Sequence, residues 1–489
     1  MALFQLTTLC KLCFYQVFLA GILWLTSARA FAQETGNSLG GRIVGYYASW
    51  NSVVLPYNKV EYSNLTDIIV AFGTPDQDGS ISYDSGIPFP QLVAAAHAAG
   101  VRVLISLGGA GSGADFSAAT KDSALRATLI SNMISFLEAN HYDGVDIDWE
   151  TPSGSTDTQK LDSLIDEMRA QFNKVDSNWL VTMAIPATSY GGGDFDFVNL
   201  INNVDWFNVM CYDFVGSWSA YSGFNAPLYQ VANDPNQAGS DSTAISYWLS
   251  RGTYYHNRQL VHVNIPKSKL VLGLPFYGDQ FSAAGLYQKL TNSTVTNTRY
   301  QNIVNDLNSG WTYHWYDPTK EPYLINSSNT EFITYEDTNS VRCKAQFAMT
   351  DTLGGIMIWE LSQDVLANGS QPLLETLGAT MRGVTPVIQR PAIASQFKLY
   401  DNYPNPFNPG TAISYELSAT GRISLTIYDV LGREVATLVN RVEQPGSYTV
   451  TFDASRLPSG VYFYRLQESG IGPSNSGIHS ETKEMVLIK

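Results

Sequence analysis

The chain has 489 residues, enough for two or three domains, and a net charge of −15, with charged residues at only 15% and aromatic residues at 12%. An acidic chain without a basic patch or run excludes nucleic acid and anionic membranes as expected partners. A neutral substrate on which aromatic rings can stack, such as a polysaccharide, fits this composition better.

Residues 1–32 have the pattern of a secretion signal. Lys11 precedes an apolar run at 14–25, and the small residues around Ala32 offer a cleavage site. The alternative is a membrane anchor, but the run is shorter than the roughly 20 residues that a spanning helix needs.

Removal of that segment leaves two cysteines, Cys211 and Cys343, which are too few for a disulfide scaffold. The six histidines show no metal-ligand spacing of the HExxH kind. We therefore expect chemistry without a metal or a cofactor.

From residue 42 to about 382, short apolar runs alternate with longer amphipathic segments, which predicts repeated βα units. The expected strands are 42–47, 66–73, 101–107, 143–149, 179–186, 204–212, 268–276 and 354–360, and the clearest helices are 88–99, 123–140, 158–175, 239–251 and 338–350. Eight such strands predict an α/β fold, a (β/α)8 TIM barrel.

The segment 143–150, DGVDIDWE, places three carboxylates in a strand-favouring run. Side chains alternate along a strand, so Asp146, Asp148 and Glu150 share one face. Like charges this close raise at least one pKa, as a general acid requires. A solvated acidic edge strand or a calcium loop is the alternative, although a calcium loop needs Gly or Asn where this run has Val and Ile.

Barrel enzymes carry their active groups at the carboxyl ends of the strands. The unusual residues of this chain fall there. Glu150 ends the fourth expected strand, Tyr212 and Asp213 end the sixth, Tyr277 follows the seventh, and Trp359 lies near the end of the eighth.

The spacing DxxDxDxE at 143–150 resembles the signature of family 18 glycoside hydrolases. Further stretches that resemble this family are SLGG at 106–109, MCYD at 210–213, GFNAPLY at 223–229, FITYED at 332–337 and GIMIWE at 355–360. The resemblance covers residues 40–382.

This resemblance implies a retaining, substrate-assisted reaction in which the N-acetyl group of the sugar attacks its own anomeric carbon. Glu150 would be the general acid and base, and Asp148 would hold the acetamide N–H and stabilise the oxazolinium ion. Asp146 would share a proton with Asp148. Tyr212 would hydrogen-bond the acetamide oxygen, while Ser106 would support the carboxylates.

Other residues are expected to bind the sugars. The resemblance implies that Asp213 contacts the same sugar and that Trp359 forms the floor of the pocket. Further candidates at this barrel end are Met210, Trp149, Tyr46, Trp218, Tyr277 and Trp50. For each of these aromatic rings, ordinary packing is the alternative.

Together with the secretion signal, the family resemblance leads us to expect a secreted endo-acting chitinase that cleaves β-1,4-linked N-acetylglucosamine polymers and works as a monomer. The alternatives are an endo-β-N-acetylglucosaminidase acting on N-glycans and a chitin-binding lectin without catalysis.

Residues 278–331 form an insertion between the seventh and eighth expected strands. Many family members carry a small α+β lobe at this point, and this segment looks short for such a lobe. Its aromatic residues, Trp311, Tyr313, Trp315 and Tyr316, are either a sugar-stacking surface or the core of the insertion itself.

Residues 383–397 contain two prolines and no periodicity, which predicts a linker. From 398 to 489 the pattern changes to strict alternation, which predicts a small β-sandwich. The alternating apolar residues are Ile413, Tyr415, Leu417, Ile423, Leu425, Ile427, Tyr448, Val450, Phe452, Val461 and Phe463, followed by the run 485–488.

This tail resembles the C-terminal domain that sorts cargo of the type IX secretion system. The matching stretches are LYDNYPNPFNP at 399–409, YDVLGREV at 428–435 and LPSGVY at 457–462. A carbohydrate-binding module is the alternative for a C-terminal β-sandwich. The resemblance implies export through the periplasm and outer membrane, to the medium or the cell surface, with the secretion machinery as partner.

Overall fold

The computed structural model describes residues 40–489 apart from 188–194, 251, 257–258, 291–293, 308, 384–396, 403, 418–420, 444–445 and 471–477. The predicted signal at 1–32 lies outside the described residues, and so does the predicted linker except for its first and last residues.

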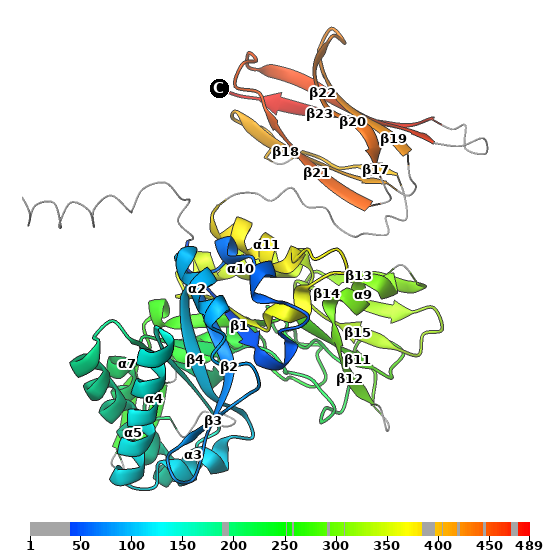
Figure 1. The fold of residues 1–489 in the computed structure, drawn as a ribbon. Coiled ribbons are helices and arrows are strands. Elements are labelled where there is room, and N and C mark those ends of the chain that lie inside the picture. Colours follow the sequence, from blue (N-terminus) through cyan, green and yellow to red (C-terminus); the bar gives the residue numbers. More distant parts are fainter. Residues whose placement is uncertain are drawn as a thin grey trace, which may run out of the picture. The chain divides into compact units, whose positions relative to one another are not determined.

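Eight parallel strands form a closed barrel (Figure 1), which confirms the predicted fold class. Strand β1 pairs with β16 on one side and with β2 on the other, and this pairing closes the ring. The barrel strands are β1 (Arg42–Ala48), β2 (Asp67–Pro75), β4 (Arg102–Ala110), β5 (Gly144–Glu150), β6 (Leu180–Pro186), β7 (Trp206–Met210), β10 (Leu270–Pro275) and β16 (Gly355–Trp359). Because β7 ends at Met210, Tyr212 and Asp213 lie in the loop after the strand rather than at its end.

Helices surround this barrel (Figure 1). They are α2 (Pro90–Ala98), α3 (Gly113–Ala119), α4 (Ser123–Asn140), α5 (Gly154–Val175), α7 (Phe197–Asn203), α8 (Asp241–Ser250), α10 (Thr338–Thr350) and α11 (Pro372–Met381). Short 3-10 turns lie at Ser49–Asn51, Tyr57–Lys59, Tyr62–Asn64, Lys267–Lys269 and Leu361–Asp364, and short strands add to the loops at β3 (Ile81–Tyr83), β8 (Gly252–His256) and β9 (Gln259–Val263). In the described part of the chain, no helix is both long and apolar enough to cross a membrane.

Strand alternation divides the barrel residues between two cores. Inward-facing side chains such as Val44, Ile69 and Met357 fill the barrel interior, while the alternate residues pack against the helices. At the amino end of the strands, the guanidinium of Arg42 lies 4.3 Å from the ring centroid of Trp206. A groove lies at the other end, beside the carboxyl ends of the strands.

The insertion after β10 is a complete lobe, so the expectation that the segment is too short for one is wrong. Five antiparallel strands and helix α9 (Tyr300–Leu307) build it. Its strands are β11 (Tyr277–Phe281), β12 (Val295–Arg299), β13 (Trp311–Tyr316), β14 (Glu321–Asn326) and β15 (Phe332–Thr334). Short strands with tight turns explain how few residues suffice.

The C-terminal part forms two sheets around one apolar core, as the alternation predicts. The strands are β17 (Lys398–Leu399), β18 (Gly410–Leu417), β19 (Gly421–Asp429), β20 (Glu434–Glu443), β21 (Gly446–Asp453), β22 (Gly460–Gly470) and β23 (Ile478–Leu487). One phase is wrong. In β22 the structure buries Tyr462 and Tyr464, not Val461 and Phe463. Alternation alone could not decide this, because all four residues are apolar or aromatic.

Candidate active site

A groove of about 970 Å³ lies at the carboxyl end of the barrel strands. Its walls combine three carboxylates with aromatic and small residues. The lining residues are Trp50, Phe72, Gly108, Gly109, Ala110, Asp148, Glu150, Pro186, Ala187, Met210, Tyr212, Asp213, Phe214, Trp218, Ala238 and Trp359.

Asp146 lies below the groove and is fully buried. It accepts four hydrogen bonds from residues of four other strands, with donors on both carboxylate oxygens. The donors are Tyr46 at 2.8 Å, Ser106 at 2.9 Å, Thr182 at 2.5 Å and Asn208 at 3.3 Å. Burial raises the pKa of Asp146, and these hydrogen bonds act in the opposite direction. The bonds also fix the strand face that carries the other two acids.

Asp148 has a different environment although it is only two residues away. Its side chain is 4% exposed, and its Oδ1 has no hydrogen-bond partner among the described residues. Burial raises its pKa well above the ordinary range, and the charges of Glu150 and Asp146 add to this effect. A buried acceptor without a donor at the floor of a groove is available for a ligand N–H.

Glu150 ends β5 and is half-buried in the groove. Burial raises its pKa, and the nearby charge of Asp213 raises it further. Such a carboxyl group keeps its proton at a higher pH than an exposed glutamate and is suited to act as a general acid.

The strand end at Glu150 is held by the loop after β4. The backbone N–H of Glu150 donates to Ser112 Oγ at 3.2 Å, and Ser112 Oγ donates to the carbonyl of Asp148 at 3.1 Å. Near the end of β4 itself, Gly108 has a φ of 116°, and a Cβ at this position would lie 2.0 Å from the carbonyl oxygen of Asp148. Only glycine permits this approach of the two backbones.

The opposite wall carries Tyr212 and Asp213. Burial raises the pKa of Tyr212 well above its ordinary value, and the charge of Asp148 acts in the same direction. Although Asp213 is exposed to the solvent of the groove, the surrounding protein desolvates its carboxyl group and raises its pKa. The hydroxyl of Tyr277 donates a hydrogen bond to Asp213 Oδ1 and opposes that shift.

Aromatic rings form a continuous platform beside the acids. Phe72 stacks between Trp50 and Trp359, with ring centroids 5.9 and 5.8 Å apart and interplanar angles of 27° and 26°. Tyr46 meets Trp359 edge-on at 5.4 Å. Flat apolar surfaces of this kind suit the faces of pyranose rings.

Comparison with known proteins agrees with this geometry. Residues 42–364 match glycosyl hydrolases family 18, and residues 401–474 match the secretion system C-terminal sorting domain. The chain belongs to glycoside hydrolase family 18. It also carries a sorting domain, which indicates export to the medium or the cell surface.

Several relatives in family 18 are chitinases by name. Chitinase A1 of Niallia circulans is 32% identical over 291 residues, which cover 54% of this chain and 41% of that protein. Chitinase ChiA of Flavobacterium johnsoniae is 26% identical over 452 residues, which cover 71% of this chain and 28% of that protein. The chain thus spans less than half the length of these two curated relatives.

A solved structure of the family has the same fold. Catalytic domain 2 of the Group II chitinase from Ostrinia furnacalis aligns with a TM-score of 0.63 at 25% identity, over 71% of this chain and 98% of that one. The aligned part corresponds in extent to one catalytic domain.

The family 18 groove brings together most of the predicted site residues. Asp148, Glu150, Tyr212, Asp213, Met210, Trp218, Trp50 and Trp359 all line it. The four aromatic residues of the insertion are not among its lining residues; they lie on β13, an edge strand of the lobe sheet.

Three predicted substrate contacts are instead covered by protein. Trp149 is 1% exposed and stacks on Phe116 at 5.0 Å behind the strand. Its predicted role as a substrate contact is therefore wrong, and the ring takes part in ordinary packing. Tyr46 and Tyr277 are 1% and 5% exposed, and each hydrogen-bonds an acid of the site instead of lining the groove.

Phe72 and Ser112 are among the residues of the groove region that sequence reasoning missed. Phe72 ends the apolar part of β2, and its position at a strand end was the available signal. Ser112 follows the SLGG stretch by three residues, but a serine in a glycine-rich loop gives no signal of its own.

Proposed function

We propose that this protein is a chitinase that hydrolyses β-1,4-linked N-acetylglucosamine polymers with retention of configuration. The observation that supports this most is the raised pKa of Glu150 in a groove where Asp148 Oδ1 is an acceptor without a donor among the described residues. The family membership and the chitinase relatives point to the same substrate.

In the proposed reaction, the acetamide oxygen of the sugar bonds to the anomeric carbon while Glu150 gives its proton to the departing glycosidic oxygen. Asp148 accepts the acetamide N–H and stabilises the positive oxazolinium ion. Tyr212 donates to the acetamide oxygen. Water then attacks the anomeric carbon, Glu150 takes its proton, and the acetamide group is restored.

The remaining groove residues would position the sugar chain. Asp213 contacts the reacting sugar, and Trp359 with its stacked neighbours forms the platform below the rings. Asp146 would share a proton with Asp148. No hydrogen bond joins these two carboxylates in the described part of the chain, so that exchange requires the Asp148 side chain to turn inward.

The test compares wild type with Glu150→Gln on chitin oligosaccharides and, in parallel, on an N-glycoprotein, with mass spectrometry of the products. We expect wild type to release short oligosaccharides and Glu150→Gln to be slower by about 10²-fold or more. Glu138→Gln is the matched control, because Glu138 is exposed on α4. If wild type cleaves only the glycoprotein, the proposed substrate changes from chitin to N-glycans. If wild type and Glu150→Gln both bind chitin and neither cleaves it, the protein is a lectin.

We also propose that residues 398–489 direct export through the type IX secretion system. Deletion of this segment should leave the protein inside the outer membrane of a bacterium that has this system. Equal amounts of the full-length and truncated proteins in the medium would contradict the proposal.

A further inference from the structure

Asn225 lies in the segment 223–229, behind the groove wall that carries Asp213. Its side chain is 1% exposed, and its Oδ1 accepts the backbone N–H of Asp213 at 2.6 Å. The carbonyl of Asn225 accepts the backbone N–H of Phe214 at 3.0 Å. Because a backbone N–H can only donate, the oxygen of the Asn225 amide must face Asp213. One buried residue thus fixes two successive residues of the groove wall.

The backbone at Asp213 needs such support. Its φ is 57°, a left-handed conformation that residues other than glycine adopt at a cost in free energy. This conformation persists only where neighbouring contacts hold it. The hydrogen bond from Asp213 to Asn225 and the one from Tyr277 to Asp213 act on the two ends of this residue.

The segment of Asn225 is itself anchored on its far side. The backbone N–H of Asn225 donates to Thr334 Oγ1 at 3.0 Å, at the end of β15. The ammonium of Lys344 on α10 donates to the carbonyl of Ala226. Both anchors come from the lobe or from the helix that follows it.

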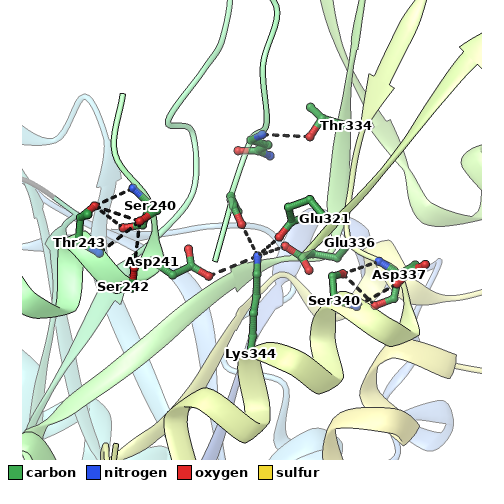
Figure 2. A network of polar contacts seen from close by, with 12 residues as sticks. Ser240, Asp241, Ser242, Thr243, Glu321, Thr334, Glu336, Asp337, Ser340 and Lys344 are labelled. Carbon is green, nitrogen blue, oxygen red and sulfur yellow. Dashed lines mark hydrogen bonds and ion pairs between the residues drawn. The ribbon is translucent and has the colours of Figure 1, made fainter. Parts of the chain in front are cut away.

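Lys344 is fully buried and belongs to a cluster of charges (Figure 2). Its Nζ lies 3.3 Å from Asp241, 2.9 Å from Glu321 and in direct contact with Glu336. These three acids come from the start of α8, the start of β14 and the segment after β15. We call these four residues the Lys344 cluster. It joins the lobe, two barrel helices and the Asn225 segment at one point.

We propose that Asn225 is a positioning residue for the Asp213 carboxylate, and that the Lys344 cluster holds Asn225 in place. The proposal rests on the proposed function, in which Asp213 and Glu150 belong to one site. By this route the lobe and α10 act on the reaction without touching the substrate.

The expected readout is the acid strength of Glu150. The charge of Asp213 adds to burial in raising the pKa of Glu150, so an Asp213 carboxylate that is no longer fixed should let that pKa fall. The alkaline limb of kcat/KM should then move to lower pH, because this profile reports the free enzyme. The other titratable groups around this pair are Asp146, Asp148, Tyr212, Tyr277 and Asp279.

The decisive experiment is a double-mutant cycle of Asn225→Ala and Asp213→Ala, with kcat/KM measured from pH 4 to pH 9. Asn225→Ala should lower kcat/KM at neutral pH by about tenfold, as loss of one hydrogen bond to the site predicts, and should shift the alkaline limb downward. In the Asp213→Ala background, Asn225→Ala should have no further effect. Additive losses, or a lower Tm with an unmoved pH profile, would overturn the proposal.

Two further variants guard against simple misfolding. Thr334→Val keeps the shape of the side chain and removes the anchor of the Asn225 N–H, so it should shift the same limb in the same direction. Asn326→Ala is the matched control, since Asn326 Oδ1 accepts backbone N–H groups from Thr330 and Glu331 in the lobe. It should lower Tm and leave the pH profile unchanged.

Direct titration of the Glu150 carboxyl by carbon-13 NMR separates this proposal from the proposed function. If wild type cleaves no chitin, the proposed function fails, and a lower Glu150 pKa in Asn225→Ala but not in Asn326→Ala would still support the positioning role. An unchanged Glu150 pKa in Asn225→Ala would overturn it whether or not the enzyme is active.

Discussion

Ser112 and Glu150 are joined by a hydrogen bond in which the Glu150 backbone N–H donates to the Ser112 hydroxyl at 3.2 Å. The same hydroxyl donates to the carbonyl of Asp148. One side chain from the loop after β4 thus bridges the backbone N–H of Glu150 and the backbone carbonyl of Asp148 at the end of β5. Ser112 is 5% exposed. The proposed acid is therefore held in place through its backbone N–H.

Ser112→Ala should lower kcat by about 5- to 10-fold, because one buried hydrogen-bonded group is worth about 1 to 1.5 kcal/mol. KM should change little, since Ser112 does not line the groove. Steady-state kinetics on a chito-oligosaccharide would measure both values. Ser135→Ala, at an exposed position on α4, should leave both unchanged. A rise in KM at constant kcat would contradict this role.

Gly108→Ala should destabilise the fold by about 3 kcal/mol or more and reduce activity strongly, because its Cβ would overlap the carbonyl oxygen of Asp148 in a backbone conformation that disfavours side chains. Gly111→Ala is the comparison. Gly111 also has a positive φ, of 85°, but a Cβ there would meet nothing within 4 Å, so we expect a cost of only about 1 to 2 kcal/mol. Urea unfolding of both variants would show whether the close approach, rather than φ, sets the difference.

Substitution of Trp149 should affect stability, whereas substitution of Trp218 should affect substrate binding. Trp149→Ala removes a ring that is 1% exposed and should cost about 3 to 5 kcal/mol of stability. Trp218 is 68% exposed in the groove, so Trp218→Ala should change stability by less than about 0.5 kcal/mol and raise KM for longer oligosaccharides. Thermal unfolding and kinetics on the two purified variants would test this. Equal stability losses would mean that one of the two placements is wrong.

Asp148→Asn should stabilise the protein at neutral pH while removing most of its activity. Burial raises the folded-state pKa of Asp148, whereas the unfolded chain keeps a value near about 4. The folded state therefore holds the proton more tightly, and wild-type stability falls as pH rises from about 4 through the raised pKa. The Tm advantage of Asp148→Asn should be present at pH 7 and disappear below about pH 4. Glu138→Gln should follow wild type throughout, and an advantage independent of pH would contradict the argument.

Local patterns determined much of this protein. The alternation at 143–150 placed Asp146, Asp148 and Glu150 on one face without any tertiary information, because strand geometry has a period of two. The eight apolar runs predicted the barrel, and the barrel predicted the end at which the site lies. From residue 398 the apolar pattern changes to strict alternation, and this change predicted the C-terminal β-sandwich.

Only the tertiary structure decided what each acid does with its neighbours. The donors to Asp146 come from strands up to 100 residues away, and no local pattern links Tyr46 to Asp146. The same holds for Asn225, which contacts the groove wall at Asp213, and for Lys344, which contacts the carbonyl of the neighbouring Ala226. Trp149 and Trp359 are alike in the sequence, but one faces the helices and the other the groove. Hydrogen bonding, burial and charge act through space, so the acid strength of the site depends on contacts that chain order does not contain.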